Sequence, residues 1–180
     1  MIPEEIQKVI ETAHMESRLA KNARQAFSWR VKTLLMHLVS CSGLNIAAAC
    51  ELLDSEFEDS ARPSLKPRPA VIEALKDLNR AAPPERIEIT PALAQHIRAF
   101  IPGKQKEIKA KSDKDTALIC KQDGTAYSRS TLRRHVQEMV RSAVPQPVDL
   151  DVDQPCQRTL CNICPLYTGL PFAVQEASGS

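Results

Sequence analysis

The sequence has few aromatic residues, few glycines and no long apolar run. Phe, Trp and Tyr make up 4% of its 180 residues, which disfavours a single-strand binder that stacks bases on aromatic rings. No apolar segment approaches the ~20 residues of a membrane-spanning helix. The N-terminal residues lack the basic and apolar segments of a secretory signal, and six cysteines are too few for a disulfide-stabilised scaffold. We therefore expect a cytoplasmic protein with no membrane segment.

The overall composition is that of an ordinary globular domain. Hydrophobic residues make up 43% and charged residues 26% of the chain, which excludes wholesale disorder. Thirteen prolines against five glycines indicate helices joined by restricted loops. We expect a helical domain over residues 1–145. Residues 146–180 are expected to form an acidic linker and a Cys-containing C-terminal segment packed on the same domain.

Apolar spacing predicts a mainly α fold with a small β-sheet (α+β). Asn45 is a suitable N-cap, and Gly43 is suited to end the preceding helix. Alternation of polar and apolar residues indicates a strand over 86–90, and a second short strand is expected over 117–120. Residues 54–84 read as an exposed connection, except that 71–79 could form a short helix or begin a strand. Helices are predicted over residues 3–14, 23–40, 46–53, 91–103 and 129–143.

The order of these segments resembles the catalytic domain of the tyrosine recombinases, the phage-integrase family. Residues 41–46 (Cys-Ser-Gly-Leu-Asn-Ile) are similar to part of the family's Thr-Gly-Leu-Arg-Ile/Val-Ser-Glu-Leu segment. Residues 87–94 match its strand-then-helix unit, and residues 124–143 are similar to the unit before its His-x-x-Arg box. Each motif alone is weak, so the resemblance depends on the ordered series.

The resemblance implies a DNA-handling fold from which the catalytic residues are missing. Family members stabilise the scissile phosphate with arginines and attack it with tyrosine. Asn45 stands at the position of the first arginine, and Gln154 and Gln157 stand at the His-x-x-Arg box. Asparagine and glutamine supply neither a permanent charge nor a guanidinium fork. No tyrosine occupies the nucleophile position, so we expect a pseudoenzyme that does not cut DNA, or a remnant or fragment of a recombinase.

Basic residues are concentrated in one part of the chain. Residues 96–145 hold eleven Lys or Arg and five Asp or Glu, a net charge of +6, while residues 146–180 carry −3. Such a cluster suits phosphate contacts without sequence readout, although it could also be a set of solvated charges. Arg129, at a helix start, is the best single candidate. The DNA-binding candidates are Lys104, Lys106, Lys109 and Lys111, in an expected mobile stretch, and Arg129, Arg133, Arg134 and Arg141.

The C-terminal segment carries a second chemical signal. Cys156, Cys161 and Cys164 form a Cys-x4-Cys-x2-Cys run that could hold zinc or contribute to an iron–sulfur cluster. A fourth ligand would have to come from Cys41, Cys50, Cys120 or His135. Alternatively, these cysteines act as small hydrophobic residues. The other three histidines, His14, His37 and His96, are expected to be isolated, with structural or exposed roles.

Three functions are therefore considered. The preferred one is a non-catalytic protein related to tyrosine recombinases that binds duplex DNA, with a role in regulating a mobile element and no cofactor. The second is a zinc or iron–sulfur interaction module that uses the C-terminal cysteines. The third is a module that docks onto an intact recombinase through residues 166–174. A homo-oligomer is a further option for its partners.

Overall fold

The fold is built around one buried helix that is flanked by others. The computed structural model describes residues 4–76, 85–108 and 115–143. Its helices are α1 (Glu4–Leu19), α2 (Ala23–Ser42), α3 (Ile46–Glu51), α4 (Pro69–Lys76), α5 (Pro91–Glu107) and α6 (Arg129–Ala143). The remaining elements are a 3-10 helix, η1 (Asp54–Glu56), and three short strands, β1 (Phe57–Glu58), β2 (Ser64–Leu65) and β3 (Ile87–Glu88). The expected class, mainly α with a small sheet, is confirmed.

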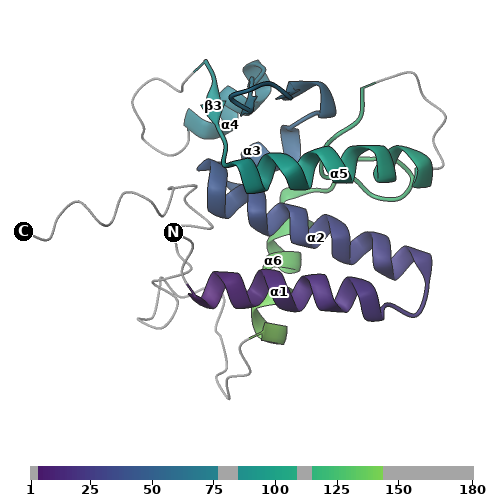
Figure 1. Cartoon of the computed structure of the whole chain (residues 1–180). Helices are drawn as coiled ribbons and strands as arrows, with labels where there is room; N and C mark the ends of the chain where they lie inside the picture. Colours follow the sequence, from purple (N-terminus) through teal and green to yellow (C-terminus); the bar gives the residue numbers. More distant parts are fainter. Residues whose placement is uncertain (1–3, 77–84, 109–114, 144–180) are drawn as a thin grey trace, which may run out of the picture.

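Helix α2 lies between α1 and α5, and α6 crosses behind this stack (Figure 1). The second half of α2 is buried on nearly all sides, and Leu34, Leu35, Met36 and Leu38 are completely buried. A helix that is hydrophobic all round belongs in the centre of a fold because each of its faces needs a covering neighbour. Helix α6 closes the core from the far end of the sequence and packs against α1, α2 and α3.

Side-chain caps mark where α2 and α5 begin. The Asn22 side chain accepts a hydrogen bond from the Gln25 N–H (2.9 Å) at the start of α2, and Thr90 accepts one from the Leu93 N–H (3.2 Å) at the start of α5. Gly43 ends α2 in the left-handed region, with φ 73°, a conformation that costs little only for glycine. The predicted turn between α2 and α3 is therefore confirmed.

The three strands form one antiparallel sheet in the order β1–β2–β3. Leu65 in the middle strand is completely buried and pairs with Phe57 on one side and Ile87 on the other. The strand expected over 86–90 is confirmed as β3. The view of residues 54–84 as an exposed connection is wrong for its described part, because this part contains η1, β1, β2 and α4. The strand expected over 117–120 is also wrong, since Ala117 and Cys120 form only isolated bridges.

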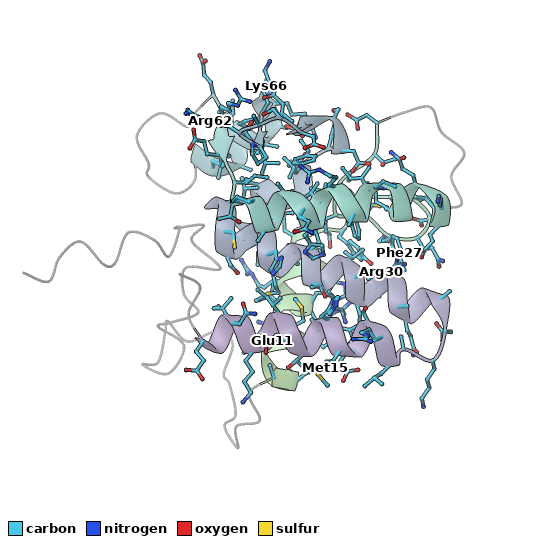
Figure 2. The ribbon with its side chains drawn as sticks, viewed as in Figure 1. Glu11, Met15, Phe27, Arg30, Arg62 and Lys66 are labelled. Carbon is cyan, nitrogen blue, oxygen red and sulfur yellow. The ribbon has the colours of Figure 1, made fainter. Side chains whose placement is uncertain are left out.

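Several helix boundaries differ from the predicted ones. Helix α1 continues five residues past the predicted end at residue 14. Helix α5 continues through Pro102 and Gly103 to Glu107, although proline removes one helical hydrogen bond. Figure 2 shows Arg30 directed from α2 towards α5, where its Nη2 lies 2.6 Å from Glu107 Oε2 and holds the last turn in place. Residues 69–76 form α4. Of the two alternatives for residues 71–79, a short helix or the start of a strand, the helix is therefore confirmed up to Lys76.

No helix of the described ranges is both long and apolar enough to cross a membrane. The predicted segment 146–180 lies outside the described residues.

Candidate nucleic-acid interface

Four exposed arginines lie on α6, and we call them the α6 arginine face. Arg129, Arg133, Arg134 and Arg141 are all exposed. At about 100° per residue, the last three fall within a sector of about 100°. The opposite side of the helix carries Leu132 and Val136, which are completely buried. The apolar pattern therefore fixes the rotation of α6 and turns Arg133, Arg134 and Arg141 outward, whereas Arg129, the first residue of the helix, lies in line with Val136 and Val140.

Within the described residues, no carboxylate forms an ion pair with the α6 arginine face. Elsewhere, Arg30, Arg68, Arg86 and Arg98 each form an ion pair with Asp or Glu. Within residues 4–76, 85–108 and 115–143, none of the four α6 arginines forms such a pair. No described ion pair therefore occupies these four guanidinium groups, although Arg129 shares an open hollow with Glu51 and Glu73.

The single acidic residue of α6, Glu138, is held by a cation from the core. Lys32 Nζ donates a hydrogen bond to Glu138 Oε2 (2.8 Å) and lies 4.1 Å from the centre of the Trp29 ring. Burial opposes ionisation of Glu138, but the hydrogen bond and charge of Lys32 outweigh it and lower the pKa of this carboxyl. Glu138 therefore subtracts little from the positive potential of α6.

Lys104 does not belong to a surface site. It lies in α5 rather than in a mobile stretch, and its side chain has 0% exposure. Its Nζ donates to Asp54 Oδ1 (2.5 Å), to Thr116 Oγ1 (3.1 Å) and to the Ala117 carbonyl (2.8 Å). Burial is the largest influence on Asp54 and raises the pKa of its carboxyl despite the nearby Lys104. Because all three ammonium hydrogens have acceptors, the prediction of Lys104 as a phosphate contact is corrected here.

Of the other three predicted lysines, one lies within the described residues. Lys106 is exposed in the last turn of α5. Lys109 and Lys111 lie outside the described residues. Among the described residues, the predicted basic side chains that are exposed are therefore the four arginines of α6 and, separately, Lys106 of α5.

Asn45 has a structural position between two helices. It is 5% exposed. Its Oδ1 accepts a hydrogen bond from the Ala48 N–H (2.7 Å) and so caps α3, while its Nδ2 donates to the Ala74 carbonyl (3.1 Å) of α4. The predicted N-cap is confirmed, and the bond to α4 was not foreseen. Both ends of the amide are used within the protein.

An open hollow of about 290 Å³ lies beside this junction, between α3, α4 and the start of α6. Glu51, Glu73 and Arg129 supply its charged walls, with Ala70 and Ala74 between them. The two residues named with Asn45 in the resemblance, Gln154 and Gln157, lie outside the described residues.

The cysteine and histidine side chains of the described residues do not form one common site. Cys50 and Cys120 are buried free thiols, and burial raises the pKa of Cys50 to about 11. The described part of the chain holds no group of three or more His, Cys, Asp or Glu that could bind a metal ion. Cys156, Cys161 and Cys164 lie outside it. Sequence reasoning missed one contact, because His37 and His96 are not isolated but face each other across α2 and α5.

Comparison with known proteins shows similarity at the level of the fold. The sequence matches no family model, and no curated protein sequence is similar to it. A crystal structure of XerA recombinase matches 81% of this chain and 43% of the XerA chain, with a TM-score of 0.53 and 12% identity. The present chain therefore spans less than half the length of that protein. At this identity the match concerns architecture alone, and the chain has a recombinase-like fold.

Proposed function

We propose that this chain is a DNA-binding protein related to the tyrosine recombinases that holds duplex DNA without cutting it. The observation that carries the proposal is the α6 arginine face: four exposed guanidinium groups on one helix with no described carboxylate partner. The likeness of the fold to XerA recombinase supports DNA as the anion. Binding without cutting would suit a regulator of a mobile element.

The expected contacts are to phosphates rather than to bases. Arg129 and Arg141 are twelve residues apart, about 18 Å along a helix with a rise of ~1.5 Å per residue, so the face can reach several phosphates. Arginine binds phosphate through two parallel N–H donors. Four such contacts give a slope of about −3.6 in a plot of log K against log salt concentration, at about −0.9 per neutralised phosphate. Lys106 and, outside the described residues, Lys109 and Lys111 would steepen this slope.

The proposal that the protein does not cut DNA rests on Asn45. Family chemistry, as the resemblance implies it, places a guanidinium at this position to stabilise charge on the scissile phosphate. Here the position holds a neutral amide whose donor and acceptor both serve the junction of α3 and α4. This arrangement supports a protein in which the position maintains the fold instead of contacting the phosphate.

Fluorescence anisotropy with a labelled duplex of random sequence tests the binding. We expect the double variant Arg133→Gln/Arg134→Gln to reduce the salt slope by about 1.8. Arg98→Gln is a matched control, because Arg98 is an exposed arginine already paired with Asp59, and it should leave the slope near that of the wild type. Absence of binding at 50 mM salt, or an unchanged slope in the double variant, would refute the proposed interface.

Incubation with supercoiled plasmid tests the second half of the proposal. We expect the plasmid to remain supercoiled at protein concentrations that saturate the duplex in the anisotropy assay. Relaxation of the plasmid, or a covalent protein–DNA product that survives denaturation, would show strand cleavage and contradict the non-catalytic role.

A further inference from the structure

Two histidines from different helices face each other inside the stack of α2 and α5. His37 Nδ1 and His96 Nδ1 are 2.9 Å apart. The two rings are nearly perpendicular, with centres 4.9 Å apart. Both residues are only partly buried. None of the functions considered above uses this pair.

Both rings are neutral around pH 7. Burial is the main cause that lowers the pKa of His96 to about 4, with further contributions from His37 and from His14 on α1. Burial and His14 also lower the pKa of His37. A neutral imidazole has one ring nitrogen with a free lone pair, which is the form that binds metal ions.

We propose that His37 and His96 bind one divalent first-row transition-metal ion, such as Zn²⁺, through their Nδ1 atoms. Zinc–nitrogen bonds are about 2.0–2.1 Å long, and near-tetrahedral geometry separates two such nitrogens by about 3.3 Å. Opening the present 2.9 Å separation by a few tenths of an ångström therefore suffices. The ring that donates its Nδ1 hydrogen in the metal-free pair changes tautomer, so that this proton resides on its Nε2, and both rings turn until their Nδ1 lone pairs face the ion.

Water completes the coordination of this site. No third His, Cys, Asp or Glu of the described ranges converges with the pair. Cys41, one turn further along α2, does not form such a group with the two histidines. The site therefore has two nitrogen ligands and no thiolate, and it should exchange its ion readily. It is chemically distinct from a thiolate site formed by the C-terminal cysteines.

The spectroscopic test uses the metal-free full-length protein and one added equivalent of ZnCl₂. Long-range ¹H–¹⁵N spectra resolve the ring nitrogens of individual histidines. We expect the Nδ1 signals of His37 and His96 to shift together and to saturate, while those of His135 on α6 stay unchanged. Unshifted signals for His37 and His96 at millimolar Zn²⁺ would overturn the proposal, and this measurement needs no variant.

A thermal-shift experiment separates this pair from the cysteine segment. It uses a full-length background in which Cys156, Cys161 and Cys164 are replaced by Ser. At free Zn²⁺ of about 100 times Kd, we expect Tm to rise by about 5–10 °C, and this rise should be lost in His37→Gln and in His96→Gln. His135→Gln, which alters a histidine outside the pair, should keep it. A rise that persists in both pair variants would overturn the assignment.

Discussion

The role of Asn45 can be tested through the stability of the fold. Asn45→Ala removes the acceptor that caps α3 and the donor that reaches the Ala74 carbonyl. Loss of an N-cap costs about 0.5–2 kcal/mol. The Ala74 carbonyl lies in the last turn of α4, where carbonyls have no partner within the helix, and the lost hydrogen bond adds about 0.5–1.5 kcal/mol. We expect Asn45→Ala to lower the free energy of unfolding by about 2 kcal/mol.

Two further substitutions at position 45 separate the contribution of the α3 cap from that of the hydrogen bond to α4. Asn45→Ser keeps an oxygen that can cap α3 but cannot reach α4, so its loss should be about half that of Asn45→Ala. Asn45→Arg restores the residue found in the recombinase family. At a position that is 5% exposed, however, it removes the cap and introduces an unpaired charge. Asn45→Arg should therefore be the least stable of the three variants.

Urea unfolding followed by circular dichroism measures these differences, and thermal unfolding checks them. A loss of about 2 kcal/mol corresponds to a fall in Tm of about 4–8 °C for a chain of this size. DNA affinity per folded molecule should not change in Asn45→Ser. If Asn45→Ala lay within 0.5 kcal/mol of the wild type, or if Asn45→Arg were equally stable, the structural role would be refuted.

Two other predictions concern buried ionisable groups. Lys104→Met leaves the Asp54 carboxylate without its cation, so urea unfolding should show a loss of about 3–5 kcal/mol in the free energy of unfolding. Lys106→Met, on the surface, is the control and should stay within ~0.5 kcal/mol of the wild type. A stable Lys104→Met variant with weaker DNA binding would contradict the reasoning. Burial, and then Lys32, lower the pKa of His135 below 6.5, so its ring takes up a proton at higher pH in the unfolded chain than in the folded one. Stability is therefore full above pH 6.5 and falls as the pH is lowered. In the presence of a chelator, His135→Gln should flatten this fall, and an identical pH profile for the variant would argue against it.

Local signals in the sequence predicted the helices well. Helices α2 and α6 carry apolar residues at regular helical spacing, and Gly43, Asn45 and Thr90 mark boundaries through interactions with their immediate neighbours. Such features depend on a few adjacent residues, so they can be read without knowledge of the tertiary structure. The outward direction of Arg133, Arg134 and Arg141 was predictable for the same reason, since the buried stripe fixes which side of the helix faces outward.

The features that were missed depend on contacts distant in sequence. The strands β1 and β2 have two residues each, too few for alternation to show. The extension of α5 beyond residue 103 depends on two contacts that are distant in sequence. Arg30 binds Glu107, 77 positions later, and Asp54 binds Lys104, 50 positions later. The pairing of His37 with His96 likewise spans 59 positions. Nothing in the residues beside Lys104 distinguishes it from Lys106, which is why both were predicted to contact phosphate.

The packing of α6 against α1 also sets the order in which the fold can be completed. Helices α1 and α2 are adjacent in sequence and can pair early, but α6, which packs against α1 and buries Leu132 and Val136, comes from the far end of the described chain. During synthesis from the N-terminus, at about 5–20 residues per second, α1 and α2 wait several seconds for this last helix. Their apolar surfaces stay uncovered over that interval, so the nascent chain is most exposed to aggregation before α6 leaves the ribosome.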